Sequence, residues 1–334
     1  WPPDRSDLRN CVVIQPPSNE RGRFDSGMGP GIGVARGRTP LGSSGRTGHA
    51  ATGTRRPPMT SPLIDAAELS ALTEDTRLAD VRWYLGVPGG GHRAYHQGHL
   101  PGAVFVDLDR HLSAPEGSGR HPLPERSVFA ATMSRLGFGD DQLIVVYDDA
   151  GGMIASRLWW MLRDIGHDAV RVLDGGIQAW LAAGRRLSTD TPDMTPRTLT
   201  VRPSLTRQID RQSLASKLGT LTILDARAPE RYRGEVEPID PAAGHIPTAL
   251  SAPTTGNLDA TGRLRPSTEL AAHFRKLVPE GEVVMYCGSG VTACHNILAM
   301  KIAGLPEATL YPGSWSDWST EGMEVVTGDE PGER

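Results

Sequence analysis

The sequence predicts two tandem α/β domains, each with a mostly parallel sheet flanked by helices. Two observations lead to this prediction. Four short motifs occur in the same order in both halves of the chain, and within each half short β-branched runs alternate with helical stretches. Strands that alternate with helices pair in parallel and are covered on both faces. A length of 334 residues also fits about two domains.

The repeated motifs are an Asp-x-Arg element, a Gly-His-x-Pro element, an apolar strand, and a turn that leads into a tryptophan-containing segment. In the first half they occupy residues 78–82, 98–103, 143–148 and 174–180, and in the second half residues 223–227, 244–249, 283–287 and 311–318. The repeat is far longer than the unit of a solenoid, so it indicates two homologous domains.

The domain boundaries follow from this repeat. We expect an N-terminal domain at residues 59–190, a linker at 191–205 and a C-terminal domain at 206–334. Residues 1–58 are rich in Gly, Arg, Pro and Ser and lack a hydrophobic period, so they cannot bury enough apolar surface to fold. We interpret them as a disordered or non-native extension before a natural start at Met59.

Composition excludes several functions. A formal net charge of -4 argues against nucleic acid as a partner, and no apolar run is long enough for a membrane span. No Cys-x-x-Cys pair indicates a zinc site, and we expect no metal and no cofactor. The three cysteines, Cys11, Cys287 and Cys294, are too few for a disulfide framework. We therefore expect a reducing compartment, the cytoplasm, and consider one cysteine a candidate nucleophile.

Cys287 stands at the most informative point of the sequence. The apolar strand at residues 283–286 leads into Cys-Gly-Ser-Gly-Val-Thr, and a helix is expected from about Val291 to Ala303. Glycines let successive backbone N–H groups point inward, and such a nest at a helix N-terminus stabilises an anion. The loop residues expected to bind the substrate are Gly288, Gly290, Val291 and Thr292. A reactive cysteine also needs an accessible, acidic thiol. The alternative is a structural cysteine buried in a tight turn.

Residues 287–295, Cys-Gly-Ser-Gly-Val-Thr-Ala-Cys-His, resemble the active-site signature of 3-mercaptopyruvate sulfurtransferases, which are tandem-domain relatives of thiosulfate sulfurtransferase (rhodanese). The resemblance extends over residues 59–328. It implies two tandem rhodanese-like domains, of which only the C-terminal one carries the nucleophile. Asp148 stands in the first repeat where Cys287 stands in the second. A carboxylate cannot take up sulfane sulfur, so we expect a catalytically silent first domain.

The resemblance also implies a reaction. The Cys287 thiolate takes sulfur from 3-mercaptopyruvate, becomes a persulfide and passes the sulfur to a thiophilic acceptor such as cyanide or a thiol. The pyruvate enolate left behind needs a proton, for which Ser289 is close enough. In the family the matching serine is linked to a histidine and an aspartate of the first domain, here His121 and Asp109. Arg231 matches the arginine that binds the substrate carboxylate. Taken alone, His121 and Asp109 would be ordinary loop residues.

Three features depart from the family pattern. Animal and enterobacterial members have a second arginine shortly after Arg231, whereas residues 235–240 here read Glu-Val-Glu-Pro-Ile-Asp. Thr248 replaces a glycine, where we expect a change of packing or turn. No basic residue directly follows the cysteine, so thiosulfate is expected to be the poorer sulfur donor, because its leaving sulfite is a dianion.

Other functions are compatible with parts of this pattern. Alternatives are a thiosulfate:cyanide sulfurtransferase, a persulfide carrier that serves a protein acceptor such as thioredoxin, and a binding module without turnover. A Cdc25-like phosphatase shares the predicted fold, but its longer loop ends in an arginine that clamps phosphate. Residues 291–294 contain no arginine, so the sequence disfavours that activity.

Overall fold

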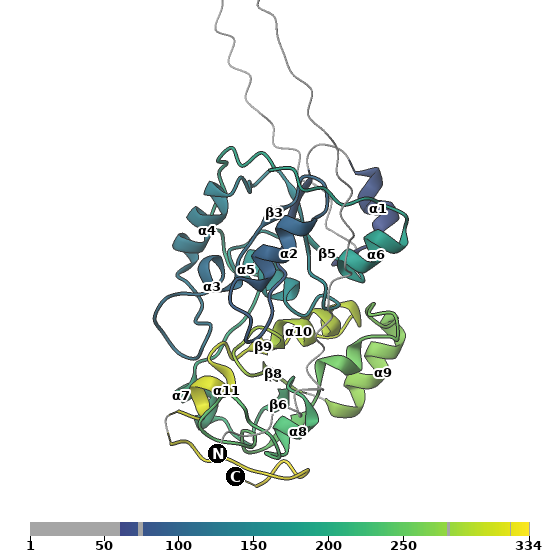
Figure 1. Ribbon diagram of the computed structural model, residues 1–334. Coiled ribbons are helices and arrows are strands. Elements are labelled where there is room, and N and C mark those ends of the chain that lie inside the picture. Colours follow the sequence, from purple (N-terminus) through teal and green to yellow (C-terminus); the bar gives the residue numbers. More distant parts are fainter. Residues whose placement is uncertain (1–60, 73–75, 279–280, 321, 334) are drawn as a thin grey trace, which may run out of the picture. The chain divides into compact units, whose positions relative to one another are not determined.

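Two parallel sheets form the framework of residues 61–72, 76–278, 281–320 and 322–333, which the computed structural model describes (Figure 1). Both sheets belong to one compact unit of the chain. The interpretation of residues 1–58 as an extension falls outside the described residues. No helix within the described residues has the length and apolar character needed to cross a bilayer.

The first sheet has the strand order β1-β5-β4-β2-β3, and every neighbouring pair is parallel. Its strands are β1 (Leu63–Ile64), β2 (Thr76–Asp80), β3 (Val104–Phe105), β4 (Leu143–Tyr147) and β5 (Val170–Leu173). The helices of this half are α1 (Ala66–Ala71), α2 (Gly90–Gln97), α3 (Leu108–His111), α4 (Arg126–Arg135), α5 (Ala155–Asp164) and α6 (Gly176–Ala182).

The second sheet has the order β7-β6-β8-β9 and is also parallel throughout. Its strands are β6 (Thr222–Asp225), β7 (Ala249–Ser251), β8 (Val283–Tyr286) and β9 (Thr309–Leu310). The helices are α7 (Arg211–Ser216), α8 (Pro229–Tyr232), the 3-10 helix η1 (Thr254–Asn257), α9 (Ser267–Leu277), α10 (Ala293–Ile302) and α11 (Ser314–Trp318). The order β7-β6-β8-β9 repeats β3-β2-β4-β5 of the first sheet, so the sequence repeat is a structural repeat and the predicted fold class is confirmed.

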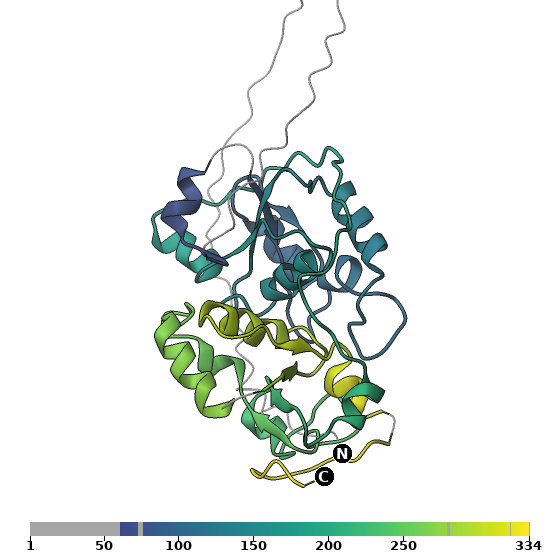
Figure 2. The same ribbon diagram turned by 180° about the vertical axis from the view of Figure 1, so that it is seen from behind.

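The central strand β8 is buried on both faces because its side chains alternate between two apolar clusters. Val283 and Met285 pack in the cluster that includes α9 and α10, whereas Val284 and Tyr286 pack with residues of α7 and α11. Figures 1 and 2 show these helix pairs on opposite sides of the sheet. This two-sided burial explains the continuous apolar run that ends at Cys287.

The two domains share one apolar core. Leu158 and Leu162 of α5 belong to the same cluster as Ile297 and Leu298 of α10, and the two helices pack against each other (Figure 2). The cysteine loop precedes α10, and the matching first-domain loop precedes α5. Packing of these helices therefore places loops of both domains close to each other.

Thr248 leaves the turn unchanged, so of the change of packing or turn expected from sequence, the change of turn is wrong. Its φ of 68° lies in the left-handed region, close to the 78° of Gly102 at the matching position of the first domain. The Thr248 hydroxyl oxygen is shielded from solvent and has no hydrogen-bond partner within the described residues. The backbone of Thr248 is therefore strained, because the turn has the left-handed conformation of the first domain and a β-branched residue rarely adopts it.

Replacing Thr248 with glycine should stabilise the protein. The change Thr248→Gly relieves the left-handed strain and the unpaired hydroxyl, and it is expected to raise the free energy of unfolding by about 1 kcal/mol after the entropic cost of glycine. Urea unfolding measures this change. The reverse change at the matching turn, Gly102→Thr, should destabilise. A loss of stability in Thr248→Gly would contradict the strain.

Candidate active site

The cysteine loop lies where the sequence predicts it, between the end of β8 at Tyr286 and the start of α10 at Ala293. Val291 and Thr292 belong to the loop, so the helix begins two residues later than expected. Within the described residues, none of the backbone N–H groups of residues 288–292 donates a hydrogen bond. The loop therefore offers a row of unsatisfied donors beside Cys287, at the positive end of α10.

The matching loop of the first domain shows what such a row of donors binds. The Asp148 carboxylate, at the position of Cys287, accepts hydrogen bonds of 2.8–2.9 Å from the backbone N–H groups of Ala150, Gly152, Ile154 and Ala155. This loop shape is thus an anion cradle, and in the first domain the cradle is filled by the chain's own carboxylate. That occupancy supports the prediction of a silent first domain.

Neighbouring turns hold the cysteine loop in place. The Cys287 N–H donates to Ser314 Oγ at 3.1 Å, and the Cys287 carbonyl accepts from the Trp315 N–H at 2.9 Å. Gly290 has a φ of 74°, and a Cβ there would lie 2.3 Å from the Pro312 carbonyl oxygen. Only glycine fits this close approach, so the spacing of the glycines after the cysteine has a steric cause.

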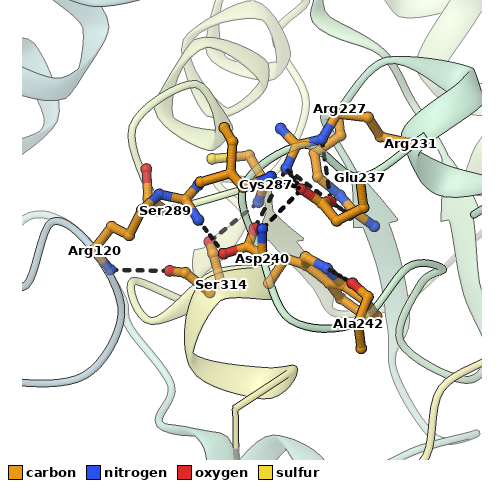
Figure 3. A network of polar contacts seen from close by, with 12 residues as sticks. Arg120, Arg227, Arg231, Glu237, Asp240, Ala242, Cys287, Ser289 and Ser314 are labelled. Atoms are coloured by element: carbon orange, nitrogen blue, oxygen red, sulfur yellow. Dashed lines mark hydrogen bonds and ion pairs between the residues drawn. The ribbon is translucent and has the colours of Figure 1, made fainter. Parts of the chain in front are cut away.

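Cys287 is buried, with 2% of its surface exposed, which corrects the expectation of an accessible thiol. Its neighbour Gly288 is covered by guanidinium groups. A Cβ on Gly288 would lie 2.9 Å from Arg120 Nη2 and 3.4 Å from Arg231 Nη1. Both arginines are held over the loop by ion pairs with Asp240 (Figure 3). The thiol is therefore covered in the described structure, and a reactant can reach it only after part of this cover moves.

Ser289, His121 and Asp109 come together as the resemblance implies. His121 Nδ1 lies 2.8 Å from Ser289 Oγ, and His121 Nε2 lies 3.4 Å from Asp109 Oδ1. Asp109 also accepts a hydrogen bond from the Trp83 indole N–H at 3.0 Å. The Trp83 and His121 rings form an edge-to-face contact with centroids 5.5 Å apart. The first domain thus supplies an oriented histidine to a serine beside the cysteine.

His121 is held in its neutral form. Burial, the guanidinium of Arg157 and that of Arg120 together lower the pKa of His121 to about 4, against the opposing effect of the Asp109 carboxylate. A neutral imidazole whose Nε2–H faces Asp109 has a free lone pair on Nδ1 for the Ser289 hydroxyl proton. The chain Ser289–His121–Asp109 can therefore accept and return a proton near neutral pH.

Arg157 is a residue of this site that the sequence prediction missed. Its side chain lies in α5 with no exposed surface, and it donates hydrogen bonds to the carbonyls of Gly290 at 3.0 Å and His121 at 2.9 Å. Burial lowers the pKa of Arg157, whereas interactions with Cys294 and Cys287 raise it. The sequence offered one signal of its role. An arginine directly before the apolar run Leu-Trp-Trp-Met indicates a buried charge, and a buried charge needs polar partners.

The predicted substrate arginine lies beside the loop but is already paired. Arg231 Nη2 lies 2.8 Å from Glu237 Oε1 and 3.3 Å from Asp240 Oδ2. The nearby Arg227 is a structural residue: its Nη2 lies 2.7 Å from Asp225 Oδ2, and its guanidinium stacks on Trp315. Within the described residues, His, Cys, Asp and Glu side chains form no cluster of three or more that could hold a metal.

The Rhodanese-like domain family matches the chain twice, at residues 65–183 and 210–321. The chain belongs to this family. The two matched ranges contain every strand of the two sheets except β1, and the predicted family is confirmed. The exact domain boundaries at residues 190 and 206 remain a prediction.

Relatives of known name are similar over most of the chain. A Pseudomonas aeruginosa protein, provisionally named as 3-mercaptopyruvate sulfurtransferase, is 46% identical over 279 residues, which are 80% of this chain and 98% of the relative. SseB of Mycobacterium tuberculosis, provisionally named as a thiosulfate sulfurtransferase, is 42% identical over 79% of this chain and 96% of its own length. The crystal structure of SseA from Escherichia coli aligns with a TM-score of 0.68 at 31% identity, over 77% of this chain and all of that one.

Removing the Arg157 guanidinium should destabilise the domain contact. The variant Arg157→Leu leaves carbonyls of both domains without their buried donor and is expected to lower the free energy of unfolding by about 3 kcal/mol. Urea unfolding measures the loss. Arg275→Leu, at an exposed position of α9, is the matched control and should change stability little. Equal stabilities of the two variants would show that Arg157 does not tie the loops together.

Proposed function

We propose that the protein is a sulfurtransferase that moves sulfane sulfur from 3-mercaptopyruvate, through a persulfide on Cys287, to a thiophilic acceptor such as cyanide or a thiol. The enzyme class agrees with the sulfurtransferase names of its relatives. One observation of the structure supports the reaction most. A cysteine beside unsatisfied backbone donors is followed two residues later by a serine that is hydrogen-bonded, at 2.8 Å, to a histidine of the other domain.

The proposed chemistry uses each of these groups. The Cys287 thiolate attacks the sulfur of 3-mercaptopyruvate, the bond between that sulfur and C3 breaks, and a pyruvate enolate leaves. The thiol proton of the sulfur donor passes through Ser289 and His121 to C3, which yields pyruvate and a Cys287 persulfide anion. The step consumes no proton. It therefore suits a neutral His121, which accepts the thiol proton and then releases it toward C3. The backbone N–H groups of Gly288, Gly290, Val291 and Thr292 stabilise the persulfide.

The acceptor and the compartment are inferred from chemistry. A persulfide yields its outer sulfur to cyanide or to a thiolate, and a protein thiol such as that of thioredoxin fits the same class of acceptor. Cys287 and Cys294 are both free thiols, which suits a reducing compartment such as the cytoplasm. Burial raises the pKa of Cys294 to about 12, so that residue stays protonated and does not compete as a nucleophile.

Thiosulfate is the second candidate sulfur donor, and the name of the Mycobacterium tuberculosis relative favours it. Cleavage of thiosulfate releases sulfite and requires no proton at carbon, so the Ser289–His121 pair would have no chemical role. We infer from this pair that 3-mercaptopyruvate is the better substrate and that thiosulfate is the poorer one.

Cys287→Ser should abolish sulfur transfer from 3-mercaptopyruvate and from thiosulfate, because a hydroxyl does not form a persulfide. Steady-state assays with cyanide as acceptor measure turnover, and intact-protein mass spectrometry detects one added sulfur atom after incubation with either compound. The matched control Cys294→Ser keeps a donor to the Gly290 carbonyl and should retain both the adduct and most of the activity. Sulfur transfer by the Cys287→Ser variant would refute the proposal.

His121→Ala should separate the two sulfur donors. Loss of the proton relay is expected to lower kcat with 3-mercaptopyruvate about 100-fold, the usual contribution of a positioned acid-base group. Persulfide formation from thiosulfate should fall much less, since no carbon is protonated. Stopped-flow and steady-state kinetics with both compounds make the comparison, and an equal loss with both would count against a relay.

A further inference from the structure

A single carboxylate, that of Asp240, joins two guanidinium groups beside the cysteine loop (Figure 3). Arg231 of α8 lies 3.3 Å from Asp240 Oδ2, and Arg120 of the first domain forms an ion pair with Asp240 Oδ1. The Asp240 side chain is only 4% exposed. Such a buried carboxylate depends on its cations, because desolvation alone would make its charge unfavourable.

The two guanidinium groups lie within one residue of the reactive cysteine. The Cβ position of Gly288 is 2.9 Å from Arg120 Nη2 and 3.4 Å from Arg231 Nη1. The guanidinium group is well suited to bind a carboxylate, and here two of them converge on the same one. The geometry is therefore that of a carboxylate site whose present occupant belongs to the chain itself.

Asp240 is held less firmly than the other carboxylate of this network. Glu237 is fixed by Arg231 and Arg227 and also accepts the backbone N–H groups of Ile239 and Asp240, each at 3.1 Å. Within the described residues, the Asp240 carboxylate accepts only from the two guanidinium groups. Glu237 therefore serves as the fixed anchor of Arg231, and Asp240 is the exchangeable ligand.

Arg120 reaches this position because its loop docks on the second domain. Gly119 has a φ of 79°, and a Cβ there would lie 2.5 Å from the Gly313 carbonyl oxygen. The Arg120 N–H donates to Ser316 Oγ at 3.0 Å. With the backbone anchored by these contacts, the Arg120 side chain can exchange one carboxylate for another without movement of the loop.

We propose that Arg120 and Arg231, one from each domain, form the binding site for the carboxylate of the sulfur donor, and that Asp240 occupies this site until the donor displaces it. This inference rests on the proposed function. It supplies the second cation that residues 235–240 lack, and it takes that cation from the other domain. Exchange of carboxylates leaves both arginines neutralised, and it holds the substrate carboxylate by the two guanidinium groups that lie against Gly288, next to Cys287.

A kinetic test uses the full chain and two sulfur donors. Mercaptoacetone has the thiol and ketone of 3-mercaptopyruvate but no carboxylate. Arg120→Gln is expected to raise KM for 3-mercaptopyruvate about tenfold, because the variant loses one charge-assisted hydrogen bond to the substrate. Its kcat should stay within about twofold of the unchanged protein. KM for mercaptoacetone should not change, whereas any effect through the adjacent His121 would appear with both compounds. Arg275→Gln, an exposed charge in α9, is the matched control.

A binding test separates this inference from the proposed function. Calorimetric titration of pyruvate into Cys287→Ser reports the carboxylate site without turnover. Adding Arg120→Gln should weaken pyruvate binding about tenfold, and adding Asp240→Asn should strengthen it, because the internal competitor is lost. Equal affinities, or no binding at all, would show that these arginines do not form the site. Weaker binding in Asp240→Asn would show that Asp240 positions the arginines and is not displaced.

Discussion

The buried guanidinium of Arg157 is the contact on which the arrangement of the site depends. It comes from a helix of the first domain and donates to carbonyls of both domains, those of Leu112 and His121 in the first and that of Gly290 in the second. The same cation ties the backbone of His121 to the cysteine loop, in the region where His121 Nδ1 lies 2.8 Å from Ser289 Oγ. A charge with no exposed surface tolerates little displacement, because each lost hydrogen bond leaves an uncompensated group in a medium of low polarity.

The second constraint is the charge balance over the cysteine. Arg120 and Arg231 lie against the loop, and carboxylates of the segment at residues 237–240 neutralise them. Cys287 is buried next to these ion pairs. In the proposed reaction, such burial would protect a persulfide from water and stray thiols, and a substrate that carries its own carboxylate would replace an internal one at small electrostatic cost.

The two domains use one loop design for two purposes. In the first domain the backbone donors bind Asp148, which stabilises the junction between β4 and α5. In the second domain the corresponding donors have no partner within the described residues and lie beside Cys287. The repeated loop therefore binds the chain's own carboxylate in the first domain and leaves its backbone donors unpaired in the second. The first domain, in turn, places Arg120 and His121 beside the cysteine loop of the second.

The sequence alone determined the duplicated parallel fold, the position of Cys287 at the end of a buried strand and the glycines that its loop requires, because these depend on local pattern and sterics. Ser289, His121 and Asp109 were matched through family resemblance, and only the structure brings them together. The roles of Arg157, Arg120 and Asp240, the burial of Cys287 and the strained turn at Thr248 were not predictable. Each arises from contacts between residues distant in the chain, and pattern along one chain does not report which surfaces of two domains meet.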